Sequence, residues 1–317
     1  MNIVFFGSSQ FAVPSLEVLI KNGYQISCVV TQPDRQKGRG LALTPTAIKK
    51  NAEGYNLKIY QPERINSEEA IRFLKNLNSD LFVVISYGQI LSQGILDIPR
   101  IFSVNVHASV LPGYRGAAPI NWAIINQEKT TGITIMQITQ EMDAGPIILQ
   151  KKIEIKDDDT SPTLENKLSL LGADLLVESL RRIKNNDYKL EPQDDSRVTL
   201  APKLKKQDGL IDWAKDARSI SGLIRGCLNW PGAFTHYRNK LLKIYKAKII
   251  LKSDYSAVPK PGEIIQVSRE GVRVAAGEDS LLIEELQIEG KKIMKAEEFI
   301  AGYKIKVGEI LDKLCAH

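Results

Sequence analysis

The densest group of side chains that could perform chemistry lies in the segment 105–116. Asn105 and His107 are two residues apart in an apolar run, so on a strand they face one side while Val104 and Val106 pack behind them. An amide can donate hydrogen bonds to a developing negative charge, and a histidine moves protons near neutral pH. A lone strand histidine is more often a satisfied core residue. The place of His107 beside Asn105 at a strand end makes an acid–base role an equal alternative.

Asp143 is a second candidate, in a loop between the strand-like runs 133–138 and 147–155. An Asp before Ala-Gly-Pro usually serves as a turn residue, because its carboxylate bonds nearby backbone groups. A carboxylate that met His107 would instead orient the imidazole ring for proton transfer. The sequence leaves both interpretations open.

The elements that must position these residues follow an alternating pattern. Helical spacing in 67–76 and 117–126 separates strand-like runs, which are 3–6, 25–31, 57–60, 81–86 and 101–106. This order predicts an α/β fold with a doubly wound, mostly parallel sheet, in which ligands bind at the carboxyl ends of the strands. The first turn lacks G-x-G-x-x-G and the chain lacks a Walker A motif, which disfavours nicotinamide and nucleoside triphosphate chemistry.

The last third of the chain has a different pattern. We interpret the polar stretch 185–209 as a linker, which leaves domains at 1–184 and 210–317. Five short strand-like runs follow it, at 233–238, 241–251, 262–267, 271–276 and 281–288. They predict a small β-barrel resembling the OB-fold, which binds oligonucleotides.

Charge is distributed unevenly over the 317 residues, whose formal net charge is +6. Residues 205–317 carry 20 Lys and Arg against 15 Asp and Glu, so five of the six surplus charges belong to this part. Lys246 and Lys248 share one strand face there and are candidate contacts for a polyanion, although lysines also protect exposed strands from aggregation. A second cationic group, Arg35, Lys37 and Arg39, occupies the loop-like segment 34–43.

Composition excludes several classes of protein. No apolar run approaches the roughly 20 residues of a membrane-spanning helix, and neither a signal nor a transit peptide is apparent. The three cysteines are far apart and lack metal-ligand spacing, so we expect no metal site. We therefore expect a cytoplasmic protein that binds neither membranes nor DNA.

Several motifs together resemble the methionyl-tRNA formyltransferases. The first half has Phe11-Ala12-Val13-Pro14, Asn105-Val106-His107, Arg115-Gly116-Ala117-Ala118-Pro119 and Met142-Asp143-Ala144-Gly145-Pro146. The second half has Ile211-Asp212-Trp213, Ile224-Arg225-Gly226 and Trp230-Pro231-Gly232-Ala233. The resemblance covers nearly the whole chain.

This resemblance implies transfer of a formyl group from 10-formyltetrahydrofolate to the α-amine of methionyl initiator tRNA. We expect a bacterial-type cytoplasmic enzyme that acts as a monomer. The resemblance assigns catalysis to Asn105, His107 and Asp143. It places the folate against the segment Ser109, Val110, Leu111 and Pro112, and it places the acceptor end of the tRNA against the loop that carries Arg39. No metal is implied.

Two other functions remain as alternatives. Formyltransferases that act on amino sugars resemble this chain in the Asn, His and Asp residues. A non-enzymatic RNA-binding protein could also keep the sheet domain as a scaffold. The basic last third and the loop that carries Arg39 disfavour the amino-sugar function. The presence of all three catalytic residue types disfavours the RNA-binding function.

Overall fold

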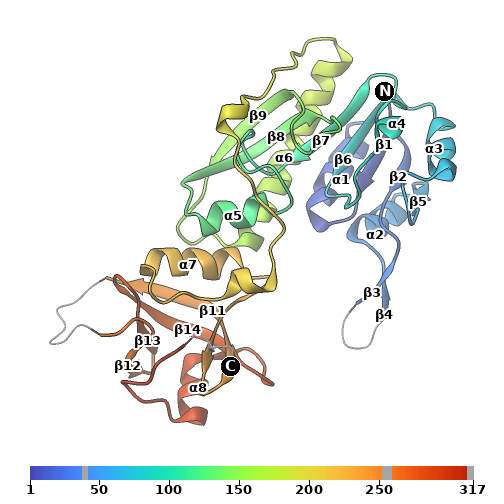
Figure 1. Cartoon of the computed structure of the whole chain (residues 1–317). Coiled ribbons are helices and arrows are strands. Elements are labelled where there is room, and N and C mark those ends of the chain that lie inside the picture. The colour runs from blue at the N-terminus through green and yellow to red at the C-terminus, as the bar shows by residue number, and fades with distance from the viewer. Residues whose placement is uncertain (38–41, 252–258, 313–317) are drawn as a thin grey trace. The chain divides into compact units, whose positions relative to one another are not determined.

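The computed structural model describes residues 1–37, 42–251 and 259–312 (Figure 1). Their contacts divide the chain into two compact units. The first unit consists of Met1–Pro119, Thr130–Glu154 and Glu165–Ala201. The second consists of Ile120–Lys129, Ile155–Leu164 and Pro202–His317. The domain limits that we infer from the sequence, 1–184 and 210–317, remain a prediction.

Seven strands form the sheet of the first unit. They are β1 (Asn2–Gly7), β2 (Gln25–Val30), β5 (Ile59–Tyr60), β6 (Leu81–Ile85), β7 (Phe102–His107), β8 (Thr130–Gln137) and β9 (Ile147–Glu154). Their order is β5-β2-β1-β6-β7-β8-β9, parallel from β5 to β7 and antiparallel beyond. The predicted mostly parallel sheet is confirmed. The order in which strands are added changes sides at β1, because β2 and β5 follow on one side of it and β6 and β7 on the other. Open α/β sheets bind ligands at such a position.

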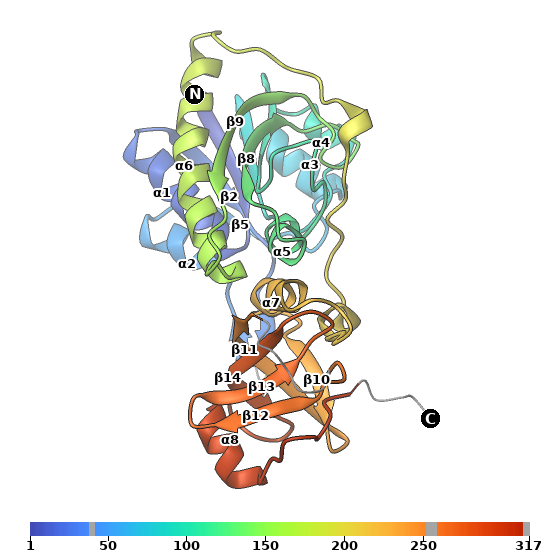
Figure 2. The same ribbon diagram turned by 90° about the vertical axis from the view of Figure 1, so that its left-hand side faces the viewer.

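Helices cover both faces of this sheet. They are α1 (Val13–Lys21), α2 (Ala47–Gly54), α3 (Glu68–Lys75), α4 (Gln93–Leu96) and α6 (Ser161–Lys184). Figure 2 shows α1 and α6 on one face and α3 and α4 on the other. The helix α6 packs closely on the sheet, because a Cβ at Gly172 would lie 3.0 Å from Val106 Cγ1. Among these helices, α2 and α3 begin at side-chain caps, with Thr46 and Ser67 accepting one backbone N–H group each.

The segment 34–43, which looks loop-like in the sequence, contains a small hairpin. Strand β3 (Arg35–Lys37) pairs antiparallel with β4 (Ala42–Thr44). Apolar residues are scarce here, so the periodicity that reveals core strands is missing. Arg39 lies outside the described residues.

The second unit is built on antiparallel strands, β10 (Ala233–Tyr237), β11 (Lys240–Ile250), β12 (Ile264–Ser268), β13 (Gly271–Ala275), β14 (Ser280–Ile288) and β15 (Met294–Lys295). The sheet order is β10-β11-β14-β13-β12, with β15 beside β14. All five predicted strands are present, in a domain consistent with the OB-like β structure expected from the sequence.

Three helices complete the second unit and the connection to it, namely α5 (Pro119–Ile125), α7 (Ala217–Gly226) and α8 (Ala296–Tyr303). The chain also has the 3-10 turns η1 (Gln10–Ala12), η2 (Asp195–Arg197) and η3 (Lys206–Gly209). Ile220 and Ile224 of α7 enter the hydrophobic core beneath the sheet. None of the helices in the described part of the chain combines the length and apolar character needed to span a membrane.

The polar stretch that we interpret as a linker is bonded to the first unit over its first part. Arg115 N donates to Thr199 O at 2.9 Å, and Ala201 N donates to Arg115 O at 2.7 Å. Glu191 exchanges two backbone hydrogen bonds with Ile147 of β9. These attachments are polar, so the hydrophobic pattern of the sequence does not reveal them.

Candidate active site

Asn105 and His107 lie at the carboxyl end of β7, between the parallel strand β6 and the antiparallel strand β8. Val104 and Val106 are buried, as the alternation along a strand predicts. His107 is buried with 6% exposure, whereas Asn105 is partly exposed. Both polar side chains thus lie at the carboxyl ends of the strands, where ligands of α/β folds bind.

The structure brings these two side chains to Asp143, which lies in the loop between β8 and β9. His107 Nδ1 is 3.6 Å from Asp143 Oδ2. Asn105 Nδ2 donates to Asp143 Oδ1 at 3.4 Å. The three predicted catalytic residues therefore form one cluster, and their roles remain a prediction.

Asp143 is held in an uncommon backbone conformation. Its φ is +52°, in the left-handed region, where a residue other than glycine needs support from its surroundings. Gly116 N donates to Asp143 Oδ2 at 2.9 Å and supplies part of that support. A Cβ at Gly145 would lie 1.9 Å from Gln137 O, so only glycine fits at this point of the turn. Asp143 is thus both a turn residue and a partner of His107.

The imidazole ring of His107 lies between two acceptors. Its Nε2 is 3.0 Å from Tyr114 O, and its Nδ1 faces the Asp143 carboxylate. A neutral imidazole has one N–H and can donate to only one of them, whereas a ring that takes up a second proton donates to both. This geometry suits a group that accepts and returns a proton.

Nothing in the sequence marks Gln193 as a functional residue, because it lies in the polar stretch without a core pattern. Its side-chain amide nitrogen, Nε2, donates to Asp143 O at 2.8 Å and to Gly145 O at 2.7 Å. Its Oε1 accepts from Arg115 Nε and Nη2 at 3.0 and 2.8 Å. Only the tertiary structure brings Gln193 to the loop that carries the carboxylate.

The segment from Ser109 to Pro112, which we expect to face a folate, is fixed by side chains of β8 and β9. Thr134 Oγ1 donates to Ser109 O at 2.7 Å and accepts from Leu111 N at 3.1 Å. Gln150 Nε2 donates to Leu111 O at 2.7 Å. Ser109 and Leu111 are buried, and the remaining two residues, Val110 and Pro112, are partly exposed. A rigid loop with a partly apolar surface results.

The hairpin carries the first group of predicted tRNA contacts. Arg35 Nη2 lies 2.8 Å from Glu63 Oε2, and both side chains are exposed. Nearby, hydrogen bonds from Lys49 and Gln61 hold the pKa of Asp34 below its usual value. Lys37 ends β3. These contacts anchor the base of the hairpin.

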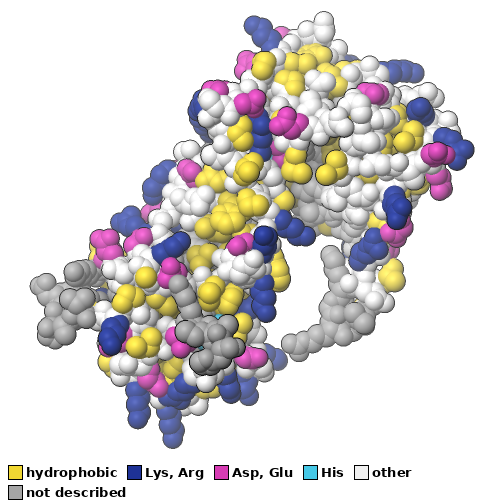
Figure 3. All heavy atoms as spheres, in the orientation of Figure 1, with side chains coloured by type: hydrophobic (Ala, Val, Ile, Leu, Met, Phe, Trp, Pro, Cys, Tyr) yellow, Lys and Arg dark blue, Asp and Glu magenta, His cyan; other side chains and the backbone are white. Residues whose placement is uncertain are grey.

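Lys246 and Lys248, the second predicted group, project from β11 toward one carboxylate. Glu284 Oε2 lies 3.3 Å from Lys246 Nζ, and its Oε1 is paired with Lys248 Nζ. Burial alone would raise the pKa of Glu284, but the hydrogen bonds from both lysines outweigh it and lower that pKa. Both lysines stay more than half exposed, at 59% and 64%. Figure 3 shows further Lys and Arg side chains projecting from the lower end of this unit.

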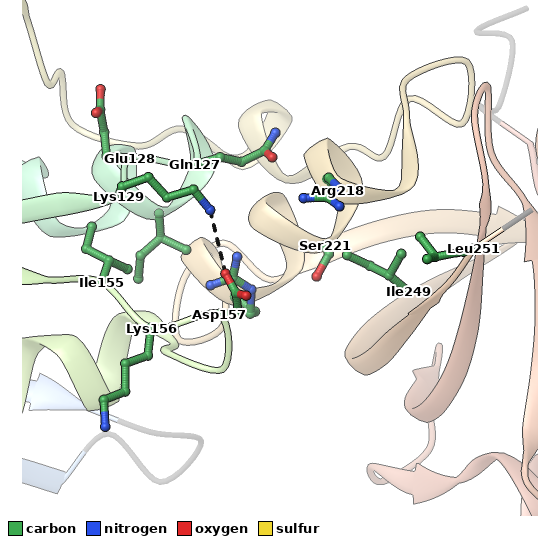
Figure 4. A pocket seen from close by; sticks show the side chains of 12 residues that line it. Gln127, Glu128, Lys129, Ile155, Lys156, Asp157, Arg218, Ser221, Ile249 and Leu251 are labelled. Carbon is green, nitrogen blue, oxygen red and sulfur yellow. Dashed lines mark ion pairs between the residues drawn. The ribbon is translucent and has the colours of Figure 1, made fainter.

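The second unit also contains a separate cavity of about 240 Å³ (Figure 4). Lys129 and Asp157 form an ion pair of 3.7 Å beside it. Arg225 Nη1 donates to Asp159 O at 2.6 Å, and burial lowers the pKa of Arg225. Acidic neighbours thus offset the cations of this cavity, and none of the residues selected from the sequence lines it.

Known families match both parts of the chain. The profile of the formyl transferase family matches residues 1–180, and that of the formyl transferase C-terminal domain matches residues 203–304. The methionyl-tRNA formyltransferase of Citrifermentans bemidjiense is 45% identical over 313 residues, which cover 99% of this chain and 97% of the relative. That of Geobacter metallireducens is 44% identical over 308 residues, which cover 97% of each chain.

Solved structures share the fold at lower identity. The sugar 3N-formyl transferase WlaRD, crystallised with dTDP and 5-N-formyl-THF, has a TM-score of 0.66 at 21% identity and covers 92% of this chain and 99% of its own. HypX from Aquifex aeolicus in complex with tetrahydrofolic acid has a TM-score of 0.62 at 17% identity. That match covers 98% of this chain but 48% of HypX.

Proposed function

The chain belongs to the formyl transferase family, and we propose that it transfers the formyl group of 10-formyltetrahydrofolate to the free α-amino group of methionyl initiator tRNA. The observation that carries this proposal is the cluster of Asn105, His107 and Asp143 in a chain whose relatives of 44–45% identity are methionyl-tRNA formyltransferases over almost their whole length. The sugar formyltransferase structures that match this chain are 20–21% identical to it, a level that shows a shared fold and does not favour the amino-sugar alternative.

The chemistry requires a hydrogen-bond donor and a proton carrier. The methionyl amine attacks the formyl carbon and forms a new C–N bond, which leaves negative charge on the carbonyl oxygen. The bond from the formyl carbon to the folate nitrogen then breaks. One proton leaves the attacking nitrogen and one reaches the departing nitrogen. A preorganised donor at the oxygen and a residue that moves protons both lower the barrier of such a reaction.

We assign the donor role to Asn105. Its 3.4 Å contact with Asp143 Oδ1 is long for an N–H···O hydrogen bond, so the amide keeps donor capacity for an oxyanion. Removal of one such donor costs other enzymes roughly 10²–10³-fold in kcat.

His107 moves the protons in this scheme, and Asp143 orients its ring. The two acceptors on either side of the imidazole, Tyr114 O and the Asp143 carboxylate, fix the ring plane during the transfer. No covalent intermediate with the protein is required.

The residues present fit a folate along the segment Ser109 to Pro112. Its backbone groups are already bonded to Thr134 and Gln150, so the loop offers a fixed and partly apolar wall. Such a wall suits the flat ring system of a folate. The segment would hold the co-substrate with its reactive group toward Asn105.

The tRNA contacts belong to two cationic groups. We propose that Arg35, Lys37 and Arg39 meet the acceptor end and that Lys246 and Lys248 meet the phosphates of the tRNA body. A role in translation initiation places the reaction in the cytoplasm. Monomeric state and the absence of DNA and membrane binding remain predictions.

The test of this function is substrate dependence. Purified protein should consume 10-formyltetrahydrofolate and yield N-formylmethionine when methionyl initiator tRNA is supplied, as followed by mass spectrometry after release of the amino acid. Uncharged tRNA is the matched control and should give no product. Equal turnover with a nucleotide-linked amino sugar would instead support the alternative.

A further inference from the structure

Gln193 links the turn that carries Asp143 to a buried arginine. Toward the turn, Nε2 of Gln193 donates to the carbonyls of Asp143 and Gly145. Away from the turn, Oε1 accepts two hydrogen bonds from Arg115. Gln193 is partly buried, whereas its neighbours from 189 to 192 and from 194 to 197 are exposed. One side chain of an otherwise exposed segment therefore turns inward.

The arginine that holds Gln193 is itself firmly placed. Arg115 is buried with 7% exposure, and its Nη2 also donates to Asp195 Oδ1 at 2.9 Å. Its backbone pairs with Thr199 and Ala201. A fixed guanidinium thus orients the amide of Gln193, leaving the NH₂ group directed at the two carbonyls.

The other side-chain contacts of the turn reach different atoms of it, with Gly116 N donating to Asp143 Oδ2 at 2.9 Å and Arg115 Nη1 lying 3.9 Å from Glu141 Oε1. Asp143 has a left-handed backbone, whose cost must be met by surrounding contacts. The hydrogen bond from Ala144 N to Glu141 O within the turn is long, at 3.5 Å. Gln193 bonds the carbonyls on both sides of Ala144 and so holds the backbone from which the Asp143 side chain projects, while Gly116 N holds the carboxylate itself.

We propose that Gln193 is a positioning residue for the formyl transfer reaction, acting through Asp143 on His107. This proposal rests on the proposed function for its kinetic test. It adds a residue from the segment 185–209 to the catalytic apparatus and gives that segment a role beyond connecting two domains.

The variant Gln193→Glu separates this role from general packing. Glutamate has the same shape and keeps an acceptor for Arg115, but it replaces the donor NH₂ by an oxygen facing two carbonyl oxygens. Those contacts become repulsive, and the turn must move. A displacement of about 1 Å near a reacting group can cost roughly 10²-fold in rate.

We expect Gln193→Glu to lower kcat by about 10–100-fold without changing KM for either substrate. In an Asp143→Asn background the same change should cost no further rate, because a residue that acts through Asp143 has nothing left to position. A full additional loss in that background, or a raised KM at unchanged kcat, would overturn the proposal.

A second readout needs no substrate. The chain has three histidines, so the imidazole signals of His107 can be assigned in a ¹H–¹⁵N spectrum by comparison with His107→Gln. Gln193→Glu should shift the ring signals of His107 and leave those of His236 in place. This result would stand even if the natural acceptor were another amine, so failure of the proposed function and failure of this inference are distinguishable.

The matched control is Gln287→Glu in the second unit. Gln287 Nε2 donates to Lys291 O at 2.7 Å and its Oε1 accepts from Tyr245 Oη at 2.9 Å, a similar arrangement far from the cluster in sequence. It should change neither kcat nor the His107 signals. If Gln193→Glu fails to fold, Gln193→Ala removes the donor without adding charge, and unchanged His107 signals and kcat in that variant would overturn the inference.

Discussion

Two polar clusters of this protein differ in burial and in how their side chains are held. Asp143 and His107 are nearly buried, and their loop is held by backbone and side-chain hydrogen bonds from Gly116 and Gln193. Lys246 and Lys248 are exposed and share a single carboxylate on a strand surface. The first cluster is enclosed by its hydrogen-bond partners, whereas the second lies on an exposed strand surface.

The difference follows from what each cluster must do in the proposed reaction. Proton transfer and oxyanion stabilisation depend on distances of a few tenths of an ångström, so their residues need a rigid frame. Attraction of a polyanion depends on charge over a longer range and tolerates movement of the side chains. Substitutions should therefore affect rate in one cluster and binding in the other.

The largest expected effect comes from the buried cluster. Asp143→Asn keeps the size of the side chain but removes the carboxylate charge that faces His107. Because proton transfer by a positioned group contributes roughly 10²–10⁴-fold, we expect a loss of about that size in kcat. Binding of tRNA, measured by filter retention, should not change. Asn105→Ala and His107→Gln should also lower kcat without changing tRNA binding. Wild-type rates in all three variants would contradict the proposed roles of these residues.

A smaller effect should come from the backbone of the same loop. In Gly145→Ala the new methyl group meets Gln137 O, so the turn must shift, which we expect to cost about 1–3 kcal/mol of stability and to lower kcat. Gly302→Ala in α8 is the matched control, since nothing lies within 4 Å of a Cβ there. Thermal unfolding and kcat should both distinguish the two variants. Equal behaviour would mean that the loop is less constrained than its contacts indicate.

The smallest effect should come from the exposed cluster. Lys246→Ala and Lys248→Ala should each weaken tRNA binding a few-fold and lower the slope of log Kd against log salt by about 1, because fewer counterions are released. Glu284→Gln should strengthen binding, since it frees both lysines from their shared carboxylate. An unchanged salt slope in both lysine variants would mean that this face of β11 does not meet the tRNA.

Much of the fold follows from local pattern. The strands β1, β2, β6 and β7 and the five strands of the second unit are short apolar or alternating runs, which the sequence marks directly. The hairpin β3–β4 cannot be predicted from hydrophobic periodicity, because its strands are short and mostly polar. Hydrophobic periodicity also cannot predict the attachment of residues 191–201 to the first unit, because that attachment is made by polar groups.

The candidate site divides in the same way. Residue type and strand spacing point to Asn105 and His107 as a pair, and family resemblance adds Asp143 to them. The sequence by itself thus determined which chemical groups are available and on which strands they lie. The tertiary structure decided that Asp143 meets His107 and that Gln193 supports the turn. These contacts span from 36 to 50 residues of chain and depend on hydrogen bonds with strict geometry, which no local pattern of hydrophobic and polar residues encodes.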